Sequence, residues 1–245
     1  MIFKTKGIVL RAIKYGETSL VVSMYTELFG LQSYMVNGVR TYTKKGPGKA
    51  NLFQSAAILD LVIYHNDLKN LQRLREFKWS YLYKNILSDV RKNAVALFMV
   101  ELLQKSIKQP ETNASLFYFV EDAFIHLDQA NEMVMANFPL FFALHLTSFL
   151  GLQMNDNYSK KNAILDLQEG NFVPEITAHP HYLEGQFSDF TSQLLKVRQP
   201  SELDQLKLNH TIRRTLLHAY LTFYALHIED FGSLKSLPVL QEVLR

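Results

Sequence analysis

The sequence predicts an α+β protein, in which a small β-barrel domain over residues 1–80 precedes a helical domain over residues 81–245. Two observations predict this division. Six of the ten glycines fall within the first 48 residues, which is typical of the closely spaced turns of a small β domain. From about residue 80 onward, apolar residues recur at helical spacing instead. Hydrophobic residues make up 48% of the chain, enough for a packed core in both parts.

Five strands are expected in the first domain. They cover residues 7–14, 20–26, 31–36 and 52–64, and a shorter stretch around Leu71, Leu74 and Phe77. The fourth is expected to be a long, bent strand that is buried on both faces. Five strands within about 75 residues, joined by sharp turns, favour a small closed barrel of the OB type. An SH3-like barrel or an open meander fits the same pattern.

The helices follow from apolar periodicity and from their end signals. Residues 94–105 and 116–127 each carry an apolar stripe, and Asn113 is expected to cap the second helix. A third helix is expected to hold Pro139 near its start and to end at Gly151. Residues 152–182 lose the helical period and are expected to form a loop or a small irregular insertion. Helical spacing returns at 187–195 and at 206–228.

A basic loop stands out between two of the expected strands. Residues 38–49 carry four cations and no acid, together with Thr41, Tyr42 and Thr43. Basic side chains that track a backbone, with an aromatic ring for stacking, are a common way for a small barrel to hold nucleic acid. A solvated surface turn would have the same composition.

Charge is distributed unevenly along the chain. The formal net charge is only +3, but residues 1–80 hold twelve Lys or Arg against five Asp or Glu, a net of +7. Residues 81–245 hold 14 basic and 18 acidic residues, a net of −4. This asymmetry favours a polyanionic partner for the first domain.

Composition and motifs exclude several other functions. The chain has no cysteine, which excludes disulfides and thiolate metal sites and indicates a reducing, cytoplasmic location. The N-terminus lacks the apolar run of a signal peptide, and the longest apolar stretch, 138–152, is too short to cross a bilayer. The segment around Gly46, Gly48 and Lys49 resembles a phosphate loop, but Thr43 and Ala50 stand where its motif needs Gly and Ser or Thr.

Signals for catalysis or metal binding are weak. The adjacent carboxylates Glu121-Asp122 and Glu229-Asp230 point in different directions on a helix and suit solvated faces. His179 and His181 could bring two imidazoles near a metal, but no third ligand stands beside them. We therefore expect no enzyme activity, no cofactor and no metal.

Four short motifs near the N-terminus and one near the C-terminus resemble a known family. Residues 6–11 read KGIVLR, 15–19 YGETS, 25–30 YTELFG and 37–40 NGVR, and residues 234–240 read LKSLPVL. In their order and spacing they resemble the bacterial RecO family of DNA repair and recombination proteins. The resemblance spans nearly the whole chain and is weakest from about 152 to 205.

The resemblance implies an OB barrel followed by a helical domain and a role as a recombination mediator rather than an enzyme. It implies binding to single- and double-stranded DNA, annealing of complementary strands, and help with RecA loading together with RecR. It also implies contacts with the C-terminal tail of single-strand-binding protein, and with RecF and RecA, in the nucleoid and away from membranes. Many members carry a four-cysteine zinc site, which this chain cannot form because the corresponding region, 152–181, has no cysteine.

The candidate site residues divide into two groups. For DNA they are basic side chains of the barrel and its loop, with one tyrosine: Arg11, Lys14, Arg40, Tyr42, Lys44, Lys45 and Lys49. Tyr15 and Tyr34 are weaker stacking candidates, because either could instead be a buried residue of the barrel core. For a protein partner they are Arg213 and Arg214, which could also extend the DNA track or form a solvated helix face.

Two other classes of function remain compatible with the sequence. The first is a protein-binding scaffold whose barrel never touches DNA, because OB barrels also bind proteins and oligosaccharides. The second is a nucleic-acid enzyme, which would need clustered carboxylates or a metal site that the sequence does not display.

Overall fold

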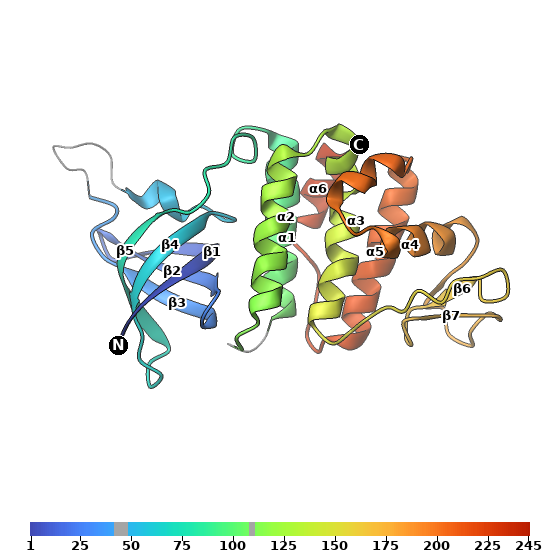
Figure 1. Ribbon diagram of the computed structural model, residues 1–245, viewed down its shortest axis with the longest axis horizontal. Coiled ribbons are helices and arrows are strands. Elements are labelled where there is room, and N and C mark those ends of the chain that lie inside the picture. Colours follow the sequence, from blue (N-terminus) through green and yellow to red (C-terminus); the bar gives the residue numbers. More distant parts are fainter. Residues whose placement is uncertain (42–48, 108–110) are drawn as a thin grey trace. The chain divides into compact units, whose positions relative to one another are not determined.

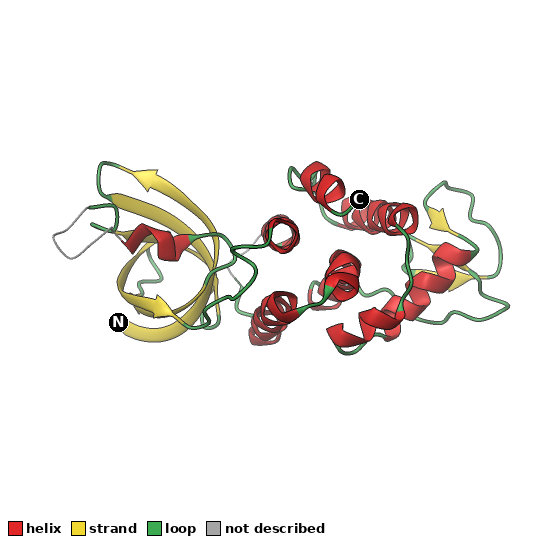
Figure 2. Ribbon diagram, turned by 90° about the horizontal axis from the view of Figure 1, so that it is seen from above, coloured by secondary structure: helices red, strands yellow, loops and turns green. Residues whose placement is uncertain are grey.

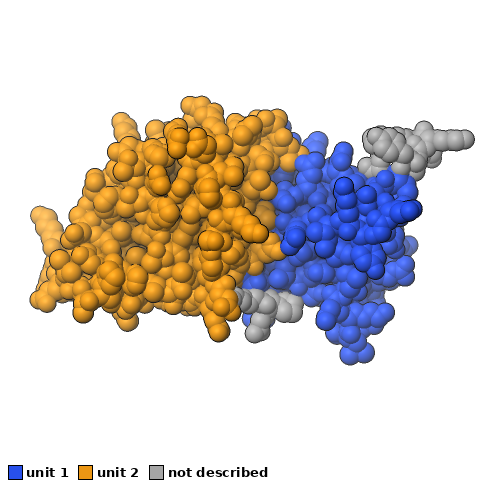
Figure 3. All heavy atoms as spheres, turned by 180° about the vertical axis from the view of Figure 1, so that it is seen from behind, with its two compact units in different colours: residues 1–84, 107–125 blue, residues 85–106, 126–245 orange. Residues whose placement is uncertain are grey.

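The computed structural model describes residues 1–41, 49–107 and 111–245. The chain forms two compact units. Unit 1 comprises Met1–Lys84 and Ile107–Ile125, and unit 2 comprises Asn85–Ser106 and His126–Arg245 (Figure 3). The predicted split at residue 80 differs from this division because a later segment of the chain clusters with the barrel.

Five strands in unit 1 close into a barrel (Figures 1 and 2). The strands are β1 (Ile2–Tyr15), β2 (Ser19–Thr26), β3 (Gly30–Val36), β4 (Ile58–Tyr64) and β5 (Leu71–Trp79), in the order β1-β2-β3-β5-β4. All neighbours are antiparallel except β3 and β5, which pair in parallel from Ser33–Leu71 to Met35–Arg73. The predicted five-stranded closed barrel is confirmed.

The barrel interior is filled by alternate side chains of its strands. Val22, Met24, Tyr34, Leu59 and Ile63 are fully buried there. Alternation of this kind gives each strand one apolar face and one face for solvent or ligand. Outward-facing positions on β1, β2 and β3 are therefore the ones that can carry a binding surface.

The prediction of one long strand over residues 52–64 was wrong in its first part. Residues Lys49–Phe53 form a short 3-10 helix, η1, and β4 begins only at Ile58. Ala56, between them, has a positive φ of 71° that interrupts an extended chain. Its backbone N–H donates to the Val9 carbonyl at 2.8 Å, and the Tyr83 hydroxyl donates to its carbonyl at 2.7 Å. These bonds hold the break in place.

Most of helix α2 (Ala114–Gln129) belongs to the barrel unit. The Lys6 ammonium on β1 lies 2.8 Å from the carboxylate of Glu121, whose side chain is 8% exposed. This hydrogen bond raises the pKa of Lys6. The Tyr25 hydroxyl donates to the Asn113 carbonyl at 3.3 Å, and burial raises the pKa of Tyr25 to about 12. Paired charges at partly buried positions fix which face of the helix meets the strands.

Helix α3 (Glu132–Phe149) is the centre of unit 2. Nearly every residue from Val134 to Thr147 is buried, because helices pack around it on several sides. Those packed against it are α1 (Val90–Ser106), α4 (Gln186–Lys196), η2 (Pro200–Gln205) and α5 (His210–His227). A last helix, α6 (Leu237–Val243), packs on α1. Among the described residues, no helix is both long and apolar enough to cross a membrane.

Pro139 lies inside α3 rather than near its start, contrary to the prediction. The helix begins earlier because Asn131 caps it, and the Asn131 side chain accepts a hydrogen bond from the Val134 backbone N–H at 2.9 Å. Pro139 cannot donate to the preceding turn. Pro139 is nevertheless buried in the middle of the helix.

The region predicted as irregular contains a small sheet. Strands β6 (Ile164–Asp166), β7 (Asn171–Val173) and β8 (Tyr182–Leu183) pair in the order β7-β6-β8. Side chains bonded to backbone groups hold it together. Asn157 bonds both the N–H and the carbonyl of Phe172, and Ser188 links Leu165 to Leu183. Strands of two or three residues are too short to leave an alternating pattern in the sequence.

His179 and His181 lie in this insertion, with ring centroids 6.0 Å apart. The His179 Nε2 faces the buried carboxylate of Asp166 at 3.3 Å, and the same carboxylate accepts the Gln168 backbone N–H at 2.7 Å. The described ranges contain no group of three His, Cys, Asp or Glu placed to hold a metal. A four-thiolate zinc site does not fit this donor set, since the chain has no cysteine.

We predict that the purified protein contains no stoichiometric zinc. Hydrogen bonds hold the insertion, so a chelator should leave the thermal unfolding midpoint unchanged. Elemental analysis after dialysis against the chelator, alongside calorimetry, measures both quantities. About one retained zinc per chain would contradict the prediction.

A basic barrel hairpin and an apolar pocket with an arginine rim

Two of the predicted DNA-binding residues lie on the β1–β2 hairpin, and a third bonds to its turn. Arg11 and Lys14 are exposed on β1, opposite Ser23 and Leu20 of β2. Arg40 lies at the turn of this hairpin, because its Nη1 donates to the Gly16 carbonyl at 2.9 Å and its backbone N–H to the Thr18 carbonyl at 3.0 Å. The fold therefore brings two cations onto the hairpin and a third to its turn.

Arg40 also has a structural role that the sequence did not indicate. Its two bonds tie the chain after β3 to the β1–β2 turn, where Gly16 has a φ of 56°. The guanidinium uses one of its five N–H groups in this bond and keeps the others for a ligand. A substitution at Arg40 would disturb the turn as well as any phosphate contact.

Lys49 is exposed at the start of η1, and its ammonium lies 5.8 Å from the ring centroid of Phe77. Tyr42, Lys44 and Lys45 fall in 42–48, outside the described residues. Of the two other stacking candidates, Tyr15 is 58% exposed at the end of β1. Tyr34 is fully buried in the barrel core, where burial raises the pKa of its hydroxyl, so it cannot stack on a base.

Arg213 and Arg214 lie at the rim of an apolar pocket within unit 2. The pocket has an aliphatic floor supplied by α3, α5, α6 and the residue that follows α6. Its floor consists of Ala136, Pro139, Leu140, Leu217, Leu240 and Leu244. His210 and Gln241 complete the polar rim. Three helices and the chain end thus converge on a hydrophobic hollow beside two guanidinium groups.

The two arginines differ in their surroundings. Arg213 is half-buried, burial lowers its pKa, and its Nη1 donates to the Leu208 carbonyl. Arg214 is exposed. Arg213 is therefore held in a fixed orientation beside the hollow, whereas Arg214 is open to a ligand from solvent.

A second hollow adjoins this pocket and adds two arginines that the sequence analysis missed. It shares Ala136, Arg213 and Leu244 with the first and is also lined by Arg91 and Arg245. Arg91 pairs with Glu132 at 2.8 Å. Arg91 and Arg245 are far apart in the sequence, so only the packing of α1 and α6 reveals that they belong to one surface.

Comparison with known proteins agrees with this architecture. The family model described as recombination protein O N terminal matches residues 1–83, and the model described as recombination protein O C terminal matches residues 87–162. A DNA repair protein RecO from Christiangramia forsetii is 35% identical over 243 residues, covering 99% of both chains. One from Bacteroides fragilis is 33% identical and one from Flavobacterium psychrophilum 32%, each over 246 residues and 99% of both chains. With both domain models matched in order and relatives aligned from end to end, this chain belongs to the RecO family of DNA repair proteins.

Proposed function

We propose that this protein binds single- and double-stranded DNA through its barrel, anneals complementary strands, and assists RecA loading with RecR on DNA coated by single-strand-binding protein. The observation that supports the DNA-binding part is that Arg11 and Lys14 are exposed on β1 and that Arg40 bonds to the β1–β2 turn. The names of the relatives support a repair role, and the family resemblance supplies the partners RecR, RecF and RecA.

Annealing of this kind requires binding alone and no covalent step. Two single strands repel each other through their phosphates, and cations that neutralise part of this charge release counterions and favour their approach. The bases must stay free to pair, which suits contacts made mainly to the backbone. We propose accordingly that the protein acts by binding alone, without turnover.

For the partner contact, we propose that the pocket of unit 2 holds the acidic, apolar-ended tail of single-strand-binding protein. An apolar side chain of the tail would pack against Leu140, Leu217 and Leu240, and tail carboxylates would meet Arg213 and Arg214. Arginine binds carboxylates with two parallel hydrogen bonds, which adds directionality to the charge attraction. DNA and the tail would then occupy different units of the chain.

The salt dependence of DNA binding tests the first part. If four to six cations contact phosphates, log K should fall with log salt concentration with a slope of roughly −3 to −4 for single strands. Replacing Lys44, Lys45 and Lys49 together by Ala should flatten this slope by about two and weaken all sequences alike. Fluorescence anisotropy across a salt series measures the slope.

A matched control removes three exposed lysines from unit 2, Lys160, Lys161 and Lys207. The control changes net charge equally, so its slope should stay at the wild-type value. An unchanged slope in the loop variant would show that the loop does not contact DNA. No binding of the wild-type protein at any salt concentration would favour a protein-binding scaffold instead.

Titration of a labelled tail peptide tests the second part. Replacing Arg213 and Arg214 by Ala should weaken peptide binding at least tenfold, because charged hydrogen bonds at a partly buried site contribute roughly 1.5–3 kcal/mol each. Arg214→Ala alone should also weaken binding without removing the Arg213 bond to Leu208. The loop triple variant should bind the peptide normally, and Arg198→Ala, an exposed arginine away from the pocket lining, serves as the charge control. Loss of binding in the loop variant only would place the tail on the barrel.

A further inference from the structure

A polar slot opens in the barrel wall between β3 and the β4–β5 loop. β3 pairs with β2 from Gly30 to Val36, but it pairs with β5 only from Ser33 onward. Before Ser33 the wall is incomplete, and a hollow of about 400 Å³ lies between the start of β3 and the loop. Ser23, Gln32, Ser33, Asp67, Lys69 and Asn70 are among its lining residues. Its volume lies in the range of roughly 300–1,000 Å³ that small-molecule sites occupy.

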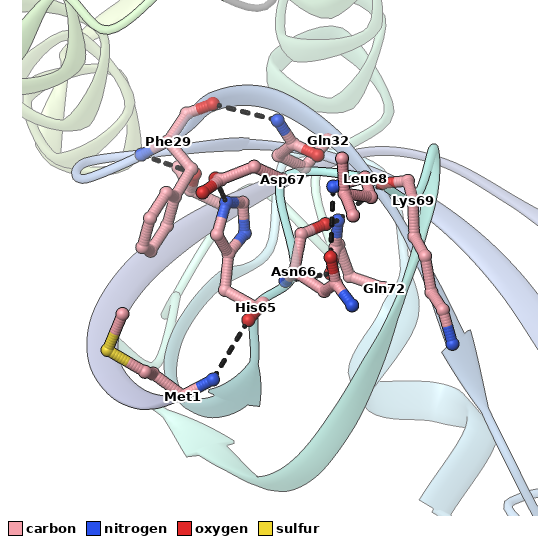
Figure 4. Close-up of polar contacts among 10 residues, drawn as sticks. Met1, Phe29, Gln32, His65, Asn66, Asp67, Leu68, Lys69 and Gln72 are labelled. Atoms are coloured by element: carbon pink, nitrogen blue, oxygen red, sulfur yellow. Dashed lines mark hydrogen bonds and ion pairs between the residues drawn. The ribbon is translucent and has the colours of Figure 1, made fainter.

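The loop beside the slot is fixed before any ligand arrives. Gln72 is 3% exposed, and its Nε2 donates to the carbonyls of Asn66 at 2.9 Å and Lys69 at 2.6 Å. Its Oε1 accepts the Asn66 backbone N–H at 2.9 Å, and the Asn66 side chain accepts the Leu68 N–H at 2.9 Å (Figure 4). A site held in this way loses little conformational entropy on binding.

An aromatic stack anchors the other end of the loop. The His65 ring lies on the Phe29 ring with centroids 3.9 Å apart and an interplanar angle of 20°. The His65 Nε2 is 2.8 Å from the carboxylate of Asp67 (Figure 4). The Asp67 carboxylate thus lies at the rim of the slot.

The chemistry of the slot suits a neutral ring with polar edges rather than a phosphate. Ser23 and Ser33 offer hydroxyls, while Asn70 and Gln32 offer carboxamides that both donate and accept. One Gln32 N–H is used on the Phe29 carbonyl, which leaves its other N–H and its carbonyl oxygen. A phosphate inside the slot would meet the Asp67 carboxylate. Lys69 gives a phosphate a better position at the edge.

Register places the slot on the same outer face of the barrel as Arg11. Arg11 is opposite Ser23, Ser23 is opposite Ser33, and Ser33 is opposite Leu71. In the next row, Met35 is opposite Arg73, an exposed cation on β5. The face of strands β2 and β3, together with the β4–β5 loop, is the surface with which OB barrels bind oligonucleotides.

We infer that this slot receives one unpaired nucleobase of a single strand, with its flanking phosphates on Lys69 and Arg73. The inference rests on the proposed DNA binding and adds to it a selectivity for single strands. A base in a duplex enters such a slot only after it has left its stack and its partner, which costs a few kcal/mol. A single strand avoids most of this cost.

Four variants test the inference, with a twelve-residue thymidine oligonucleotide and a blunt 12-bp duplex as probes. Lys69→Ala should reduce the single-strand salt slope by about 0.7, which corresponds to about fivefold weaker binding at 0.1 M salt. Ser33→Phe fills the slot and Asn70→Ala removes a hydrogen-bonding edge. Both should weaken single-strand binding at least fivefold, with the slope unchanged and duplex affinity within twofold of wild type. Lys78→Ala, an exposed lysine elsewhere on β5, should bind as wild type does.

An abasic oligomer of the same length separates base from backbone contacts. Because the abasic oligomer has no bases to enter the slot, the Asn70→Ala and Ser33→Phe variants should bind it as tightly as the wild-type protein does. Asn70 lies in the loop, so Asn70→Ala tests the slot without altering β3. A thermal unfolding measurement shows whether Ser33→Phe is still folded. Equal binding of the thymidine oligonucleotide by wild type, Asn70→Ala and Ser33→Phe would overturn the slot while leaving the proposed function intact. Failure of the wild-type protein to bind either probe would overturn both.

Discussion

Closure of the barrel depends on a short parallel pairing between β3 and β5. The pairing runs only from Ser33–Leu71 to Met35–Arg73, yet it closes a curled sheet into a barrel. Gln72 lies in the middle of this seam and is buried. Its side-chain amide bonds to backbone groups of the loop that leads into β5. The same side chain therefore sets the end of the core and the shape of the slot beside it. One side chain thus contributes both to barrel closure and to the candidate binding surface.

The two units divide the chemistry of the protein. The barrel presents cations on a hairpin whose turn is fixed by Arg40, and long extended strands space those charges along a surface. The helical unit presents a hollow with arginines around apolar side chains, where short ligands with an acidic and an apolar part would fit. Under the proposed function, the strands would supply the long track that a polyanion needs, and the packed helices the small pocket that a peptide end needs.

Much of the fold could be predicted from the sequence because the strands and long helices carry clear periodicity. The failures have specific causes. Leu52 and Phe53 are apolar, as strand residues often are, but the positive φ of Ala56 breaks the strand, and nothing in the residue type announces it. Pro139 suggested a helix start, since a helix interior tolerates proline only when its surroundings compensate. The insertion strands are too short to show a period.

The candidate sites were less predictable than the fold. Basic residues on β1 could be named from composition, and the pair Arg213-Arg214 from its place on a long helix. The pocket around Arg213 and Arg214 could not be predicted, because it combines residues from α3, α5 and the chain end. Tyr34 was considered for base stacking but is buried in the core. The alternating pattern of β3 does not by itself show which face of the strand points into the barrel. Binding surfaces arise from tertiary packing, which one sequence records only indirectly.

The barrel unit is discontinuous along the chain, and this has a consequence for its synthesis. Residues 107–125 belong to it, although helix α1 of the other unit lies between them and the last strand. As the ribosome releases the chain from its N-terminus, all five strands emerge while Lys6 and Tyr25 still lack Glu121 and Asn113. The nascent barrel thus presents an uncovered face until about forty further residues have been made. Its final stability is acquired late, at a point in translation that helix α2 determines.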